Sequence, residues 1–202
     1  MKKLEINPKA KALIFDLDGT LADTMPVHFW AYKNILTEYG INFTPELFAT
    51  LAGIPAVGTI EKLNEIFKTK MDAEKVGHFK EQEYEKIMHK MKPIVPVVEL
   101  AKKYHGKLPM AVGTGGYNRL AWKTMNILGL DKYFDILVSS NDITHAKPHP
   151  ETFLKCAELL EIEPKFCEVF EDGDLGMQAA KSAGMMSKLV TNYYEVTIGQ
   201  NI

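Results

Sequence analysis

The chain has 202 residues, 46% of them hydrophobic, and carries a formal net charge of -2 at pH 7. This length and composition allow one good core, or a core domain with a smaller insert, and disorder is not expected. The small net charge gives no general attraction to nucleic acid or to an anionic membrane, so any phosphate must be bound by a local site. No run of about 18 apolar residues occurs, and no membrane partner is expected.

The two cysteines, Cys156 and Cys167, lack the spacing of metal ligands and are predicted to be buried thiols rather than a disulfide. The first residues lack the continuous apolar segment of a secretion signal. We therefore expect a soluble protein in a reducing cytoplasm.

The first predicted element is a short apolar strand over residues 12–15, which should be buried on both faces. It leads directly into the sequence Asp-Leu-Asp-Gly-Thr at residues 16–20. Open α/β sheets bind their ligands at the carboxyl ends of strands, where these two carboxylates and the glycine turn fall. A polar turn leaving a strand would have the same composition, so this motif alone leaves both interpretations open.

Helical patterns dominate the next part of the chain. Four helices are expected there: over residues 24–39, from residue 44, and over residues 56–68 and 72–91. Gly40 ends the first helix, and Pro45 takes the first helical position of the second. Residues 22–93 are therefore predicted to form an all-helical insert.

From Pro93 onwards, predicted helices and strands alternate, which is typical of a parallel sheet. Strands are expected at residues 109–113, 136–139, 167–170 and 187–190, and helices at residues 95–104, 118–128, 150–160 and 175–183. With the first strand, this gives five parallel strands, and right-handed crossovers would make a doubly wound α/β sheet. The predicted domains are an α/β core of residues 10–21 and 94–192, the insert, and a C-terminal tail of residues 193–202.

Three further polar motifs follow predicted strands or precede predicted helices. They are Thr114-Gly115-Gly116, Lys147-Pro148 and Glu171-Asp172. The first offers a hydroxyl and backbone N–H groups to an anion at the start of a helix. The second offers a positive charge on a stretch that proline keeps extended. Each motif alone is also common in ordinary turns, loops and strand ends.

The order of these four motifs resembles that of the haloacid-dehalogenase-like hydrolases. More narrowly, Lys147-Pro-His-Pro-Glu-Thr-Phe and Phe170-Glu-Asp-Gly-Asp-Leu-Gly resemble the β-phosphoglucomutase-like branch, particularly its fructose-1-phosphate phosphatase members. The resemblance covers residues 10–190. It implies a Rossmann-like sheet in the order 5-4-1-2-3, with the first strand at the centre, and a mobile cap formed by residues 22–93.

Four carboxylates, those of Asp16, Asp18, Glu171 and Asp172, should repel one another at neighbouring strand ends, so a cation is expected among them. Ligand sets made only of oxygen atoms suit Mg²⁺ better than zinc. The resemblance implies that Asp16, the backbone carbonyl of Asp18 and Asp172 bind the ion. Glu171 would bind it directly or through water.

The resemblance implies a phosphatase in which Asp16 attacks phosphorus and Asp18 acts as general acid and then general base. Donors and positive charge must also meet the phosphoryl oxygens. Thr114 and Lys147 would supply them as catalytic groups. The remaining expected contacts to the phosphate or substrate are Gly19, Thr20, Gly115 and Gly116.

Of the six histidines, His28 is the one with an expected functional role. The branch that this chain resembles also carries histidine there, near the hinge and facing Asp18, which implies a substrate-side or gating role. A partly buried helix residue is the alternative. His145 and His149 flank Lys147, and surface or loop-capping roles are favoured over metal ligation.

The expected partner is a small phosphorylated metabolite such as fructose 1-phosphate, acted on by a monomeric enzyme. Two alternatives are a sugar-phosphate mutase and a non-catalytic phosphate-binding or regulatory protein. The mutases place a lysine and an arginine in a cap loop where this chain has Ala52 and Ala56, which favours the hydrolase. Lysines on other helices could substitute: Lys62, Lys80 or Lys90.

Overall fold

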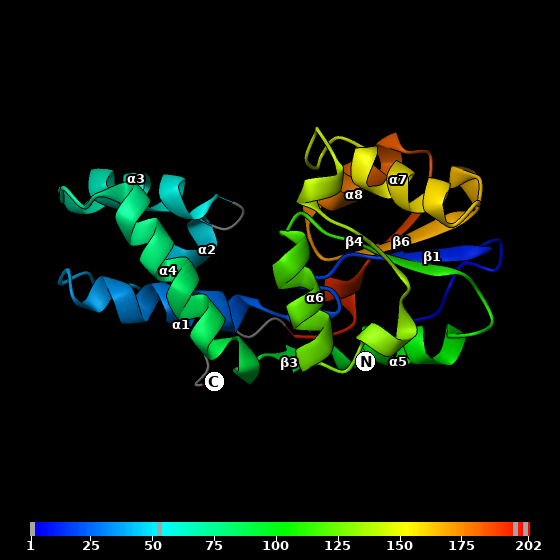
Figure 1. Cartoon of the computed structure of the whole chain (residues 1–202), viewed down its shortest axis with the longest axis horizontal. Coiled ribbons are helices and arrows are strands. Elements are labelled where there is room, and N and C mark those ends of the chain that lie inside the picture. Colours follow the sequence, from blue (N-terminus) through cyan, green and yellow to red (C-terminus); the bar gives the residue numbers. More distant parts are fainter. Residues whose placement is uncertain (1–2, 52–53, 196–197, 200–201) are drawn as a thin grey trace. The chain divides into compact units, whose positions relative to one another are not determined.

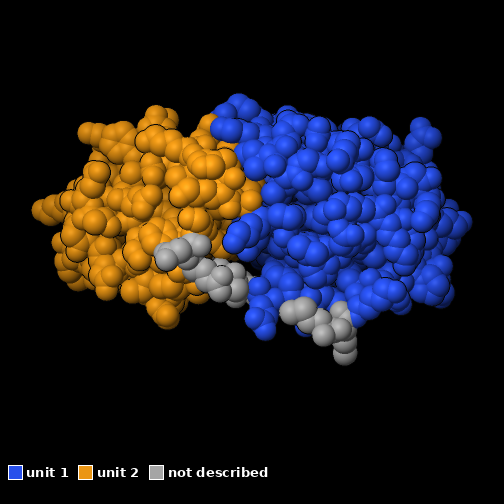
Figure 2. All heavy atoms as spheres, turned by 90° about the horizontal axis from the view of Figure 1, so that it is seen from below, with its two compact units in different colours: residues 1–23, 92–196 blue, residues 24–91, 197–202 orange. Residues whose placement is uncertain are grey.

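The computed structural model describes residues 3–51, 54–195, 198–199 and 202. The chain forms two compact units, which Figure 2 distinguishes by colour. Residues 1–23 and 92–196 make the first unit, and residues 24–91 and 197–202 make the second. Within the described residues, every helix is too short or too polar to cross a membrane.

The first unit is built on a five-stranded parallel sheet in the order β5-β4-β1-β6-β7. The strands are β1 (Ala12–Phe15), β4 (Met110–Gly113), β5 (Ile136–Val138), β6 (Cys167–Glu171) and β7 (Met186–Leu189). The first strand therefore lies at the centre, between β4 and β6, as predicted. All four residues of β1 are buried, because helices cover both faces of a doubly wound sheet.

Helices α7 (Glu151–Leu159) and α8 (Asp174–Ser182) lie on one face of the sheet, and α5 (Val95–Tyr104) and α6 (Asn118–Ile127) lie on the other (Figure 1). Short 3-10 helices complete the connections: η2 (Asp131–Tyr133), η3 (Ser140–Asp142), η4 (Pro164–Phe166) and η5 (Val190–Asn192). Under α7 and α8, Ile14 packs with Phe153 and Val169. Cys156 and Cys167 are free and buried there, as predicted.

The second unit is helical. It contains α1 (Met25–Thr37), α2 (Pro45–Thr50), α3 (Ala56–Phe67), α4 (Ala73–Ile87) and the 3-10 turn η1 (Met88–Lys90). Side-chain caps start two of the helices: Thr44 accepts from the Leu47 amide and Asp72 from the Lys75 amide. Helix α4 packs along α1, and an aromatic cluster that includes Phe29 fills the core of the unit (Figure 1).

Strands β2 (Ala22–Asp23) and β3 (Lys92–Pro93) pair as a short antiparallel ribbon in the first unit. The predicted helical insert, residues 22–93, includes these residues. Two-residue strands are too short to show the alternation that identifies a strand. The ribbon lies where the chain leaves the first unit and returns to it.

Candidate active site

Three carboxylates meet at the carboxyl end of the central strands. Asp16 follows β1 directly, Glu171 ends β6, and Asp172 is the next residue. One oxygen from each lies within 4.8 Å of the others. Asp16 and Glu171 are buried and Asp172 is half-buried. A set of oxygen atoms this close together can hold a divalent cation.

The pKa values of Asp16 and Asp172 in this cluster are perturbed. Burial raises the pKa of the Asp16 carboxyl well above its usual value, and Glu171, Asp172 and Asp18 add to the rise against the opposing charge of Lys147. Burial, together with Glu171, raises the pKa of Asp172 to about 7. Packing carboxylates together out of water therefore favours protons on them, and a bound cation would relieve that repulsion.

Lys147 reaches into this cluster from the loop before α7. Its Nζ lies 2.6 Å from Asp16 Oδ1 and 2.8 Å from Glu171 Oε1, and it also donates to the Gly113 carbonyl. Burial alone would lower the pKa of Lys147, but the two carboxylates raise it above its usual value. The lysine therefore keeps its positive charge beside Asp16.

Glycine is needed at Gly19, in the turn after β1. Its φ of +84° is a conformation that other residues rarely adopt, and a Cβ there would lie 2.2 Å from Asp172 Oδ2. Thr20 donates its hydroxyl hydrogen to Asp172 Oδ1 at 3.2 Å. The turn thus packs directly against Asp172.

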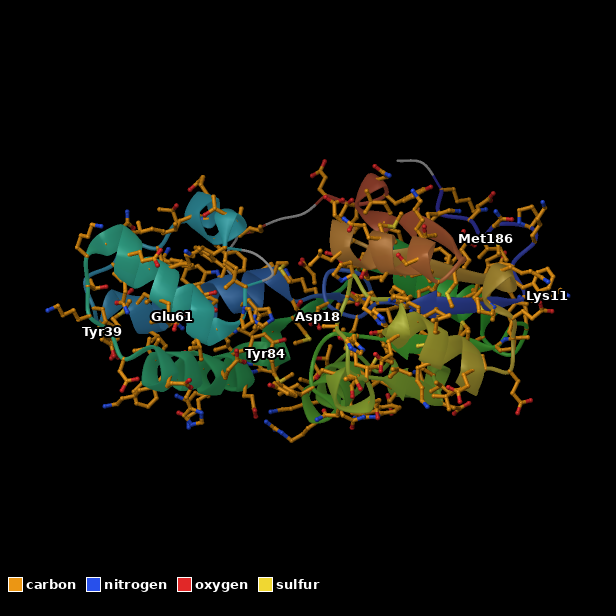
Figure 3. All side chains as sticks on the ribbon, turned by 90° about the horizontal axis from the view of Figure 1, so that it is seen from above. Lys11, Asp18, Tyr39, Glu61, Tyr84 and Met186 are labelled. Atoms are coloured by element: carbon orange, nitrogen blue, oxygen red, sulfur yellow. The ribbon has the colours of Figure 1, made fainter. Side chains whose placement is uncertain are left out.

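Asp18 and Thr114 face each other within the same unit. Thr114 Oγ1 donates to Asp18 Oδ2 at 3.3 Å and accepts from the Gly116 amide at 3.0 Å. Figure 3 shows Asp18 beyond the end of β1 and Lys11 at its start. Apart from Gly115 itself and its two chain neighbours, no atom of the described residues lies within 4 Å of where a Cβ on Gly115 would be. The carboxylate of Asp18 is therefore held toward Thr114, beside an open stretch of backbone.

Tyr194 also belongs to this site, although no sequence motif predicts a role for it. Its hydroxyl donates to the Gly19 carbonyl at 2.5 Å. Burial raises its pKa, and the nearby carboxylates, with Asp172 first, raise it further, so the hydroxyl stays protonated as a donor. No pattern in the tail pointed to Tyr194, because its contact depends on the tail returning to the turn after β1.

His28 lies in the helical unit, on α1. Its Nδ1 is 2.9 Å from Lys80 Nζ, and its ring stacks on Tyr84, which Figure 3 labels. Burial lowers the pKa of His28 well below its usual value, and the charge of Lys80 lowers it further. The imidazole is therefore neutral, with Nδ1 accepting from the lysine. The expectation that His28 faces Asp18 remains a prediction.

A buried carboxylate beside a lysine and two further acidic side chains, at the end of the central strand of a doubly wound sheet, is an arrangement typical of hydrolases that work through a carboxylate. Residues 13–190 match the family described as haloacid dehalogenase-like hydrolase. The chain belongs to this family.

Several relatives are similar over most of their length. The fructose-1-phosphate phosphatase YqaB of Escherichia coli is 37% identical over 86% of this chain and 92% of its own. The beta-phosphoglucomutase of Bacillus subtilis is 29% identical over 88% and 81% of the two chains. The crystal structure of a candidate beta-phosphoglucomutase from Thermotoga maritima has a TM-score of 0.75, with 33% identity over 87% and 82% of the chains.

Proposed function

We propose that the protein is a Mg²⁺-dependent phosphatase of a small sugar phosphate, such as fructose 1-phosphate, with Asp16 as the nucleophile. The observation that carries the proposal is the short contact between Asp16 and the half-buried, charged Lys147. This contact supports the proposal because a fixed cation beside Asp16 could bind the oxygens of a phosphoryl group that Asp16 attacks. Family membership and the fructose-1-phosphate phosphatase of Escherichia coli support hydrolysis of a phosphoric monoester.

The reaction divides into two transfers. In the first, an Asp16 carboxylate oxygen bonds to phosphorus, and the sugar oxygen leaves with the electron pair of the P–O bond and takes a proton from Asp18. In the second, water bonds to phosphorus, its proton returns to Asp18, and the acyl phosphate bond breaks to free Asp16 and inorganic phosphate. Asp18 therefore has to change its protonation state between the two steps.

The phosphoryl oxygens need donors that are held in place before the reaction. Lys147 supplies a charge and Thr114 a hydroxyl, while the amides of Gly115 and Gly116 lie just before α6. Gly19 and Thr20 would add contacts from the turn after β1. The hydrogen bonds among these residues support a preorganised phosphate site.

The carboxylate cluster fits Mg²⁺ because its donors are all oxygen atoms and burial raises the pKa values of Asp16 and Asp172. Asp16, Asp172 and the backbone carbonyl of Asp18 would hold the ion. When bound, the ion neutralises the carboxylates and the charge of the phosphoryl group. Both Glu171 oxygens already accept, from Lys147 and from the Gly173 amide, which favours an indirect contact with the ion.

The mutase alternative requires a second phosphate-binding site, and the beta-phosphoglucomutase relative keeps it open. Ala52 lies outside the described residues, and Ala56 begins α3 without a charge to offer. Among the substitute lysines, Lys62 pairs with Glu65, and Lys80 is buried against His28 and Glu81. These partners favour hydrolysis over transfer to a second sugar.

The intact pair of Asp16 and Asp18 argues against a non-catalytic phosphate-binding protein, which would not need a nucleophile beside an acid. We also propose that the helical unit acts as a cap with His28 on the substrate side. The enzyme is expected to work as a cytoplasmic monomer without a nucleic acid partner.

Phosphorus NMR with a panel of sugar phosphates tests this function. In Mg²⁺, fructose 1-phosphate or a related ester should give inorganic phosphate, and a chelator should stop the reaction. β-Glucose 1-phosphate with a trace of glucose 1,6-bisphosphate separates the alternatives. Glucose 6-phosphate formed faster than free phosphate would support the mutase, and no turnover of any ester would support the binding protein.

A further inference from the structure

A second group of metal-binding side chains lies around the loop that leads into α7. His145, His149 and Glu151 each offer one ligand atom, and these atoms lie within 4.8 Å of one another. The Nδ1 atoms of His145 and His149 lie 2.9 Å and 3.7 Å from Glu151 Oε2. Two ligand atoms on a tetrahedral zinc ion lie about 3.4 Å apart. Small side-chain movements would therefore bring all three atoms onto one ion.

The carboxylate of this group is already held in one orientation. Glu151 Oε1 accepts from the Thr144 amide at 2.7 Å, and Oε2 accepts from the His145 amide at 2.9 Å. These backbone hydrogen bonds and the His145 side chain lower the pKa of Glu151, so the carboxylate stays ionised. Ligands of metal ions are commonly oriented by such additional hydrogen bonds.

We propose that His145, His149 and Glu151 form a binding site for a divalent transition-metal ion of the zinc type. Imidazole nitrogens suit zinc and its neighbours, whereas the oxygen atoms around Asp16 suit Mg²⁺. The side chains of His145 and His149 are 63% and 50% exposed, so water fills the remaining coordination positions. The chain thus has two cation sites with different metal preferences.

The residues of the zinc-type site flank Lys147 in the sequence. Lys147 points to Asp16, while the side chains of His145 and His149 meet at Glu151. An ion bound there would tie together the two ends of the Lys147 loop without using any of the residues proposed for catalysis. The inference therefore does not rest on the proposed phosphatase function.

Titration of the full chain with Zn²⁺ in excess Mg²⁺ tests the site, because Mg²⁺ then occupies the carboxylate cluster. Under these conditions, calorimetry should give a binding stoichiometry of one Zn²⁺ per protein. Proton–nitrogen NMR spectra of the histidine side chains should show the signals of His145 and His149 shifting while the other four stay. Shifts at other histidines, or no shift at these two, would overturn the proposal.

A double variant, His145→Gln with His149→Gln, supplies the second test. Its Zn²⁺ affinity should fall by at least about 10-fold, the size of effect found when even an orienting partner of a metal ligand is lost. The matched control is His105→Gln, which removes an exposed histidine of the same unit and should leave the affinity unchanged. Equal affinity in the double variant and the wild type would contradict the assignment.

Discussion

Lys147 is the residue on which the charge balance of the candidate active site depends most. It is the cation that Asp16 and Glu171 share, and both carboxylates are buried. Breaking a buried ion pair by removing one partner leaves the other charge without compensation. Loss of the lysine should therefore weaken the binding of anions and favour a proton on Asp16.

Beryllium fluoride, which resembles a phosphoryl group, should bind between Asp16 and Lys147 in the presence of Mg²⁺. Fluorine NMR can detect the bound form directly, so the measurement does not need turnover. Lys147→Met should lose most of this binding because the positive charge is gone. Lys155→Met, which removes a half-exposed lysine of α7, is the matched control and should bind as the wild type does. Equal binding in both variants would exclude Lys147 as the phosphate-binding cation.

The residues of the carboxylate cluster could be predicted because Asp16, Glu171 and Asp172 directly follow or end recognisable strands. In a parallel sheet, the carboxyl ends of neighbouring strands lie at the same edge, so residues at these positions come together regardless of the conformation of the loops. Tyr194 and Glu151 could not be predicted in the same way. Their contacts depend on the path of a tail and of a loop, and neither path leaves a periodic pattern in the sequence.

At the scale of elements, the pairing of α1 with α4 holds His28 against Lys80. Lys80 is only 3% exposed and lies over the ring of Tyr84 as well as beside His28. Its charge and the burial of the imidazole both keep His28 neutral. The two helices therefore fix the protonation state of the histidine.

Lys80→Met should raise the pKa of His28, because it removes the positive charge that opposes protonation. The pKa should stay below the usual value for histidine, since burial remains the larger cause. NMR titration of the His28 ring measures this shift, and Lys86→Met on the exposed part of α4 is the control. A His28 pKa that does not move in Lys80→Met would contradict the contact.

The strands and helices of the first unit follow the predicted order because their apolar runs are bounded by clear turns. Gly129, for example, lies just past the end of α6 with a positive φ, as expected of a residue that ends a helix. The ribbon of β2 and β3 was not predicted, because its strands are too short to show the alternation of apolar and polar residues that identifies a strand. The helix predicted to reach residue 91 ends at Ile87 and continues only as the turn η1.

At the scale of the whole molecule, Asp172 would link the proposed metal binding to stability. The usual pKa of an aspartate carboxyl is 3.8, whereas the pKa of the Asp172 carboxyl in the folded protein is about 7. Between these values, the folded state holds a proton that the unfolded state has lost. The contribution of Asp172 to stability is therefore fully present below about pH 4 and is lost as the pH rises through about 7.

In metal-free protein, the melting temperature of the wild type should fall relative to that of Asp172→Asn as the pH rises from about 4 to about 7. Mg²⁺ should stabilise the wild type most at the upper end of this range, where Asp172 is ionised and can bind the ion. Thermal unfolding at several pH values, with and without Mg²⁺, makes the comparison. If the melting temperatures of the two proteins change with pH in parallel, Asp172 does not titrate in this range.

The proposed mechanism requires Asp16 to carry the phosphoryl group during turnover. Acid quenching of the enzyme at steady state with Mg²⁺ and its best sugar phosphate, followed by mass spectrometry of the peptides, measures this directly. We expect one phosphoryl group on the peptide that contains Asp16, at that residue. Asp16→Asn should carry none and should lose activity by a factor on the order of 10⁴ or more. Phosphate release at the wild-type rate by Asp16→Asn, with no phosphoryl group on Asp16 of the wild type, would contradict the account.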